Sequence, residues 1–187
     1  MAYLTDIQLK VMGFKYLGLG VKISDRASIY NANQMEIGHY SRIDDFCVVS
    51  GKVAIGRNVH ITPNCLVAGG ESGLVIEDFC TFAYGVMIFT QSDDYSGTTM
   101  TNSTIPKRYK AEVKQPVLIR RHVIVGAGSV IFPGVTLNEG TSVGAMSLIR
   151  KSTEEWSVYV GNPAVKIKKR KKNLLELEKQ FLEGFVK

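Results

Sequence analysis

Three histidines and one pair of aspartates are the side chains of this 187-residue chain best suited to acid–base chemistry. An imidazole, with a reference pKa of about 6.5, can accept a proton near neutral pH. An aspartate, with a reference pKa of about 3.9, is too weak a base unless its surroundings raise that pKa. We predict that His60, in NVHITPN, is the general base and that Asp93 or Asp94 orients its ring. His39 and His122 fall in IGHYSR and IRRHVI, where we expect solvent-exposed corners.

A second candidate site is a basic run near the C-terminus, in a chain of net charge +6. Six of the eight residues from 165 to 172 are cationic: Lys166, Lys168, Lys169, Arg170, Lys171 and Lys172. Such a run is either a solvated tail or a site for phosphate groups. Nucleic-acid binding is not expected, because neither interleaved aromatic residues nor a known binding module accompanies the charges.

The secondary structure that must position these side chains is indicated by a six-residue repeat. An apolar residue occurs at every sixth position, in three in-phase blocks. They are Ile37, Ile43, Val49, Ile55, Ile61 and Val67; Ile76, Phe82 and Ile88; and Ile119, Val125, Ile131, Leu137, Val143 and Ile149. This period matches neither an amphipathic helix nor a half-buried strand. It predicts an all-β solenoid of short parallel strands, with about five coils.

A second inward position, four residues after most of these, holds small or apolar residues that include Cys47, Cys65 and Cys80. We interpret these cysteines as buried packing residues and expect neither a disulfide framework nor a metal site. Free thiols favour a reducing, cytoplasmic location. No secretory signal is apparent, and no stretch approaches the ~20 apolar residues of a membrane span, so membrane insertion is not expected.

Breaks in the repeat divide the chain into segments. We predict an N-terminal helical segment (1–20), a β-helix domain (21–168) with a loop insertion (92–118), and a C-terminal helix (169–187). The first helix covers residues 4–12, with Thr5 or Asp6 as its N-cap, and Asn173 is the expected N-cap of the last. A loop as long as 92–118 in a compact domain favours a functional role. The apolar stripe of Leu174–Leu182 is expected to pack over the end of the solenoid or on a neighbouring chain.

The hexads VGAGSV (125–130), IFPGVT (131–136) and VGAMSL (143–148), with the closing GNPA (161–164), resemble the hexapeptide-repeat acyltransferases. More specifically, they resemble the galactoside and maltose O-acetyltransferase branch and its relatives in polysaccharide gene clusters. The resemblance implies a left-handed parallel β-helix, a homotrimer and acetyl-CoA as the acyl donor.

The same resemblance implies a donor site in the groove between two solenoids of the trimer. Small residues at Ala127 and Ala145 would let the pantetheine arm approach the backbone. Arg150 and Lys151 occupy the stretch that lies nearer the nucleotide, and Lys168 matches a basic position that meets CoA phosphates.

The chain departs from this family where a histidine base is usual, in a stretch like I-x-T-H. Here Gln91 follows Ile88-Phe89-Thr90, and glutamine cannot act as a base. The resemblance implies an O-acetyltransferase for a sugar hydroxyl, in surface polysaccharide biosynthesis. Because Gln91 cannot supply its base, we predict that His60 of one chain meets Asp93 or Asp94 of its neighbour. The alternative is an N-acetyltransferase for a nucleotide-linked amino sugar, because an amine needs less help from a base.

Two other classes share this fold. A lyase resembling the γ-type carbonic anhydrases would need three histidines converging on zinc, and the histidines here lack that family's close pair. The second class is a catalytically inactive scaffold, which would be recognised by CoA binding without any acyl transfer.

Overall fold

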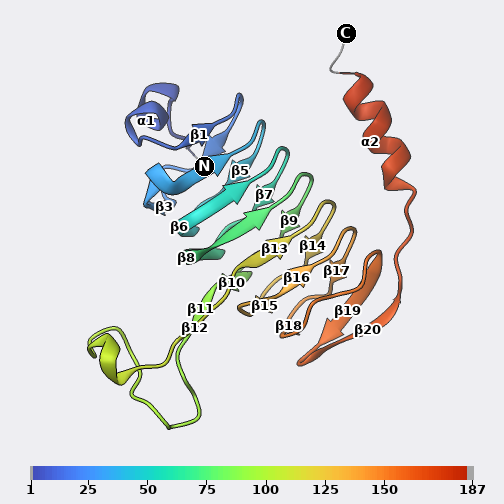
Figure 1. Cartoon of the computed structure of the whole chain (residues 1–187). Helices are drawn as coiled ribbons and strands as arrows, with labels where there is room; N and C mark the ends of the chain where they lie inside the picture. Colours follow the sequence, from blue (N-terminus) through green and yellow to red (C-terminus); the bar gives the residue numbers. More distant parts are fainter. Residues whose placement is uncertain (1, 185–187) are drawn as a thin grey trace.

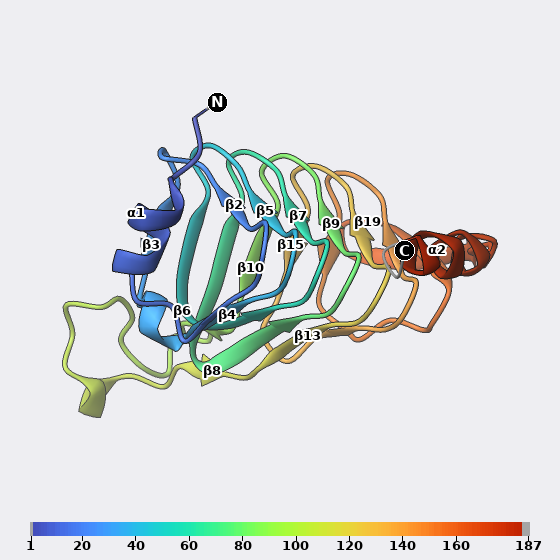
Figure 2. The ribbon, with the colours of Figure 1, turned by 90° about the horizontal axis from the view of Figure 1, so that it is seen from above.

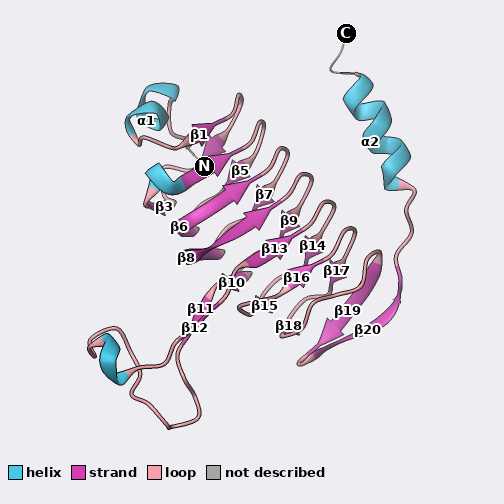
Figure 3. Cartoon of the chain, viewed as in Figure 1, coloured by secondary structure: helices cyan, strands magenta, loops and turns pink. Residues whose placement is uncertain are grey.

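The computed structural model describes residues 2–184, which form a prism of stacked coils with a helix near each end (Figures 1 and 3). Each coil contributes one short strand to each of three faces, and equivalent strands of successive coils pair in parallel. The chain makes about seven turns, not the five expected, because the irregular first turn and the closing hairpin also join the stack. The predicted all-β solenoid is confirmed.

We name the faces A, B and C. Face A contains β2 (Lys22–Ile23), β5 (Arg42–Ile43), β7 (His60–Ile61), β9 (Thr81–Phe82), β14 (Ile124–Val125), β17 (Ser142–Val143) and β19 (Ser157–Gly161). Face B contains β3 (Ser28–Tyr30), the first halves of β6 (Val48–Ile55) and β8 (Leu66–Ile76), β10 (Met87–Phe89), β15 (Val130–Ile131) and β18 (Leu148–Ile149). Face C contains β1 (Tyr16–Leu17), β4 (Met35–Ile37), the second halves of β6 and β8, β13 (Val117–Ile119) and β16 (Thr136–Leu137).

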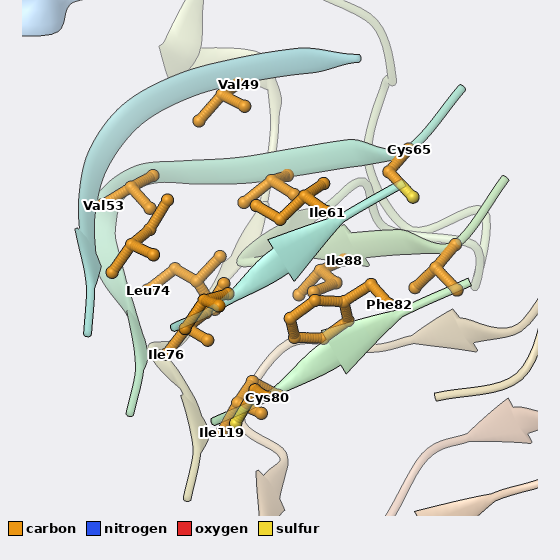
Figure 4. Close-up of a cluster of buried hydrophobic side chains, with 14 of the residues drawn as sticks. Val49, Val53, Ile61, Cys65, Leu74, Ile76, Cys80, Phe82, Ile88 and Ile119 are labelled. Atoms are coloured by element: carbon orange, nitrogen blue, oxygen red, sulfur yellow. The ribbon is translucent and has the colours of Figure 1, made fainter. Parts of the chain in front are cut away.

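The repeated apolar residues fill the inside of the prism, as predicted. Every one of them is at most 4% exposed. Figure 4 shows part of this core, where Ile61, Phe82 and Ile88 from neighbouring coils lie close to one another. Cys65 and Cys80 lie at opposite ends of the cluster drawn in Figure 4, and the three cysteines are free and buried. Burial raises the pKa of the Cys80 thiol to about 12, which suits a packing role.

The N-terminal helix α1 (Asp6–Val11) is shorter than the predicted 4–12. Thr5 is its N-cap and forms a capping box with Gln8, in which each side chain bonds the other's backbone N–H. A short 3-10 turn, η1 (Ala32–Gln34), follows β3. Among the described residues, no helix is long and apolar enough to span a membrane.

The C-terminal segment differs from the prediction in its first residues. The stretch that leads to α2 (Leu174–Glu183) begins as β20 (Ala164–Lys169), an antiparallel partner of β19 across a turn at Gly161–Pro163. Asn173 occupies the N-cap position but makes no side-chain capping bond. Residues 185–187 of the predicted helix lie outside the described residues.

Helix α2 lies beside the prism, not over its end, at the corner between faces C and A (Figure 2). Phe181 packs edge-on against Phe79, with ring centroids 6.2 Å apart. Glu178 accepts a hydrogen bond from His122 at 2.8 Å, and the His122 ring stacks on Phe79 at 5.4 Å. The expectation that His122 is a solvated corner is wrong, because α2 and Phe79 cover it. His39 is half-buried, and its ring nitrogens contact the Tyr16 hydroxyl and the Leu19 N–H.

The long loop leaves the prism after β10 and projects on the side opposite α2 (Figures 1 and 2). Its stem is an antiparallel pair, β11 (Gln91–Ser92) and β12 (Val113–Lys114), and it holds one 3-10 turn, η2 (Lys107–Tyr109). The predicted insertion of 92–118 ends slightly too late, because Val117 and Leu118 already belong to strand β13.

Candidate active site

His60 is an accessible acid–base group that points outward from β7 on face A. Its Nε2 lies 2.9 Å from Oδ2 of Asp44, whose side chain is only 3% exposed. Asp44 also accepts hydrogen bonds from Arg42, at 2.5 and 3.1 Å, and these bonds raise the pKa of the guanidinium. The His60 side chain itself is 37% exposed, so it can meet a ligand. A buried carboxylate thus orients an accessible imidazole within one chain.

Sequence reasoning missed Asp44 and assigned its orienting role to Asp93 or Asp94. The signal was present in the coil repeat, because strand pairing sets Arg42 directly beside His60, one coil apart. Asp44 follows Arg42 by two residues, so it begins the turn on the coil next to His60. Within one chain, Asp44 is the carboxylate that orients His60.

The two loop aspartates have different environments. Asp94 accepts hydrogen bonds from the Ser96 N–H at 2.8 Å and the Thr99 hydroxyl at 3.0 Å. Bonds from Ser96, Thr99 and Thr98 hold its pKa at about 2. Asp94 therefore acts as an anchor of the loop backbone. Among residues 2–184, the Asp93 carboxylate receives one long hydrogen bond, 3.4 Å from the Asn102 N–H, which leaves it available to a ligand.

Asp93 lines a pocket of about 330 Å³ where the loop leaves the prism. The other lining residues include Ser50, Ala68, Phe89, Gln91, Ser103 and Glu112. The hydrogen bond from Lys110 lowers the pKa of Glu112, so this side chain adds a carboxylate to the pocket near neutral pH. Polar and acidic walls suit a ligand that carries hydroxyl groups or an ammonium group.

His60 and Asp93 do not meet within one chain. His60 is on face A, whereas Asp93 lies beyond the far edge of face B, in the loop that follows β10. The proposed meeting of these residues across two chains remains a prediction.

The corner between faces A and B carries Ala127 and Ala145 on adjoining coils. The Met146 N–H donates to the Ala127 carbonyl at 2.8 Å, and one coil further the Gly128 N–H donates to the Tyr84 carbonyl at 2.9 Å. Within residues 2–184, the N–H groups of Ala127 and Ala145 donate to no protein acceptor. At the strand spacing of about 4.8 Å, these two free donors form a short ladder for an extended ligand with amide groups.

The predicted basic residues separate into different roles. Lys168 is exposed on β20 and has no ion-pair partner in the described chain, whereas Lys166 pairs with Glu154. Arg170 donates to two backbone carbonyls beneath α2, at 2.7 and 3.0 Å, and burial lowers its pKa. Arg150 and Lys151 follow β18 at the next corner, between faces B and C.

A parallel β-helix with an open backbone ladder, a cationic strand at one end and a polar side pocket has the features of a group-transfer enzyme. Comparison with known proteins gives the class of enzyme.

No protein-family profile matches the sequence. The dTDP-4-amino-4,6-dideoxy-D-glucose acyltransferase of Escherichia coli is 42% identical over 184 residues, which cover 97% of this chain and 95% of that protein.

Solved structures similar to this chain also belong to an acyltransferase. AntD, an N-acyltransferase from Bacillus cereus in complex with dTDP and 3-hydroxybutyryl-CoA, superposes with a TM-score of 0.97 at 42% identity, covering 99% of this chain and 98% of AntD. A serine-to-alanine mutant of AntD, in complex with dTDP-4-amino-4,6-dideoxyglucose and coenzyme A, gives 0.97 at 43% identity, covering 98% of each chain.

The chain therefore belongs to the left-handed β-helix acyltransferases, and it is an enzyme of that family. The broader resemblance seen in the hexads is confirmed. The narrower one, to the galactoside and maltose branch, is not, because these relatives are named for a nucleotide-linked amino sugar and for N-acyl transfer.

Proposed function

We propose that this enzyme transfers an acyl group, acetyl in the first instance, from acyl-CoA to the amino group of a dTDP-linked 4-amino-4,6-dideoxy sugar. The observation that carries the proposal is the 42% identity to the Escherichia coli acyltransferase along nearly the whole of both chains. The alternative prediction of N-acylation is thus better supported than the O-acetylation of a sugar hydroxyl.

The chemistry of the site supports an amine acceptor. The amine nitrogen attacks the thioester carbonyl, the C–N bond forms, the C–S bond breaks, and the sulfur leaves as a thiolate. The nitrogen must lose protons on the way, and the thiolate finally takes one up. Gln91 cannot accept a proton. An amine is intrinsically more nucleophilic than a hydroxyl, so an amine acceptor can react without a histidine base at position 91. His60 is the proton acceptor in this proposal, and Asp93 holds the ammonium form of the acceptor.

The proposed assembly is a homotrimer. An apolar column runs up the outer side of face B through directly paired residues: Val48, Leu66, Met87, Val130 and Leu148. A monomer would leave this column in contact with water. A three-fold axis beside face B and parallel to the prism keeps equivalent coils at one height. The loop of one copy then reaches the A–B corner of the next, which supports a site shared by His60 and the neighbour's Asp93.

The donor follows the A–B corner in this proposal. Pantetheine amides accept from the free N–H groups of Ala127 and Ala145, and Lys168 meets the phosphates at the C-terminal end of the stack. Arg150 and Lys151 lie at the next corner, where they would face the nucleotide of CoA bound to a neighbouring copy.

Acyl transfer measured by thiol release tests the function. Acetyl-CoA should be consumed with dTDP-4-amino-4,6-dideoxyglucose, with the amide product confirmed by mass spectrometry, and the matching 4-hydroxy sugar nucleotide should react at least a hundredfold more slowly. Equal or faster turnover of hydroxyl acceptors such as galactosides would overturn the N-acyl assignment. A monomer by light scattering at micromolar concentration would overturn the trimer and the shared site.

A further inference from the structure

Tyr84 stands out on the corner ladder that the proposed donor follows. The ladder positions above it are small, Ala127 and Ala145, whereas Tyr84 places a phenol ring there that is 64% exposed. Among the described residues, neither its ring nor its hydroxyl has a partner. The Gly128 N–H bonds the Tyr84 carbonyl at 2.9 Å, so Tyr84 is directly one coil below Ala127. It is the first large side chain at this position of the coil repeat, below Ala145 and Ala127.

The length of the donor brings its reactive end to this ring. Three coil spacings, from the hairpin above Ala145 down to Tyr84, span roughly 14 Å at about 4.8 Å per coil. The Gly161 N–H bonds the Ser147 hydroxyl at 3.1 Å, which places the tip of the β19–β20 hairpin over this corner. A pantetheine arm has roughly the backbone length of four residues, and an extended chain of that size covers about the same 14 Å. A thioester thus falls beside Tyr84.

Resting on the proposed function, we infer that Tyr84 sets the size of the acyl group, and that its ring restricts the donor to short acyl chains such as acetyl. An acetyl group ends at the ring. A four-carbon group such as 3-hydroxybutyryl, the donor bound in the AntD complex, continues along the ladder into the space that the ring fills. One extra methylene that has no room in a pocket typically costs about 10- to 200-fold in kcat/KM.

The fold around Tyr84 allows a clean substitution. The side chain is exposed, and the following Gly85, at φ +68°, has open space where its missing Cβ would lie. Truncation of Tyr84 removes an exposed ring and keeps the backbone carbonyl that accepts from the Gly128 N–H. Tyr30, 58% exposed on the first coil and far from the ladder, offers a matched control.

The test measures kcat/KM for acetyl-, butyryl- and 3-hydroxybutyryl-CoA with dTDP-4-amino-4,6-dideoxyglucose. The wild-type enzyme should prefer acetyl-CoA by at least tenfold. Tyr84→Ala should bring the donors within about threefold of one another by raising kcat/KM for the longer ones. Tyr84→Phe, which keeps the ring and removes the hydroxyl, should keep the wild-type preference, and so should Tyr30→Ala.

Unchanged selectivity in Tyr84→Ala, or a wild-type preference for 3-hydroxybutyryl-CoA, would overturn the inference and leave the proposed function in place. Loss of selectivity in Tyr84→Phe would also overturn it, since the hydroxyl and not ring volume would then decide. If no acyl-CoA supports transfer to the amino sugar, the proposed function fails, and the inference fails with it.

Discussion

The prism and the loop each supply one residue of the proposed site, and different interactions hold the two residues in place. His60 lies on a strand whose neighbours on both sides are set by parallel pairing, and a buried carboxylate fixes its ring. Asp93 lies in a loop held by short-range bonds, many of them to Asp94 and Asn102, with no residue of the segment 91–116 fully buried. The prism is therefore suited to precise orientation, and the loop to adapting around a variable acceptor.

This contrast means that chemistry and acceptor binding should respond to different substitutions. Changes in the prism half should alter kcat, because they disturb proton transfer. Changes in the loop half should mainly alter the acceptor KM or kcat/KM, because they disturb binding.

The largest expected effect is on the prism half. His60→Ala should lower kcat by about 10² to 10⁴-fold, since that is the usual contribution of a general base. Steady-state kinetics with acetyl-CoA and the amino-sugar nucleotide measures it. His39→Ala and His122→Ala are the controls and should stay near the wild-type rate. A near-normal rate for His60→Ala would show that the amine reacts without a histidine base.

The next effect is on the loop half. Asp93→Asn should lower kcat/KM for the amino acceptor by roughly 10- to 100-fold, because a hydrogen bond to a charged group is worth about 1.5–3 kcal/mol. The acyl-CoA KM should not move. Asp25→Asn, an exposed aspartate on the first coil, serves as the control. The comparison breaks down if Asp93→Asn lowers kcat alone and leaves the acceptor KM unchanged.

A smaller effect is expected at the cationic strand. Lys168→Ala should raise the acyl-CoA KM about tenfold with little change in kcat, since a phosphate contact is equally strong in the ground state and the transition state. Lys166→Ala should change KM less, because Lys166 already pairs with Glu154. An unchanged KM after neutralising the whole run of 166–172 would return it to the role of a solvated tail.

The smallest effect concerns the anchor of the loop. The folded-state pKa of Asp94, about 2, lies below its ordinary value of 3.8, so its contribution to loop order is complete above about pH 4 and is lost as the pH falls through about 2. The NMR shift of the Ser96 amide, which donates to this carboxylate, should titrate with a midpoint near 2. A midpoint near 4 would mean that Asp94 is free, and that the two aspartates are equivalent.

Much of the fold follows from local rules that the sequence alone displays. An apolar residue at every sixth position can be buried only if three short strands form each coil, so the prism, its inward cysteines and the position of the loop were predictable. Thr5 as a helix cap follows in the same way from its spacing to Gln8. Gln91, in place of the usual histidine, raised the amine acceptor as an alternative from sequence alone, although the main prediction was a sugar hydroxyl.

Only the tertiary structure decided what the segments outside the repeat contact. His122 is buried because α2 turns back along the prism and offers Glu178, and no period in the sequence encodes where that helix comes to lie. Asp93 and Asp94 are adjacent and chemically identical, yet loop hydrogen bonds occupy one and leave the other open. A repeat specifies its own register, whereas contacts between distant segments depend on the whole packed chain, and these determine which carboxylate can act.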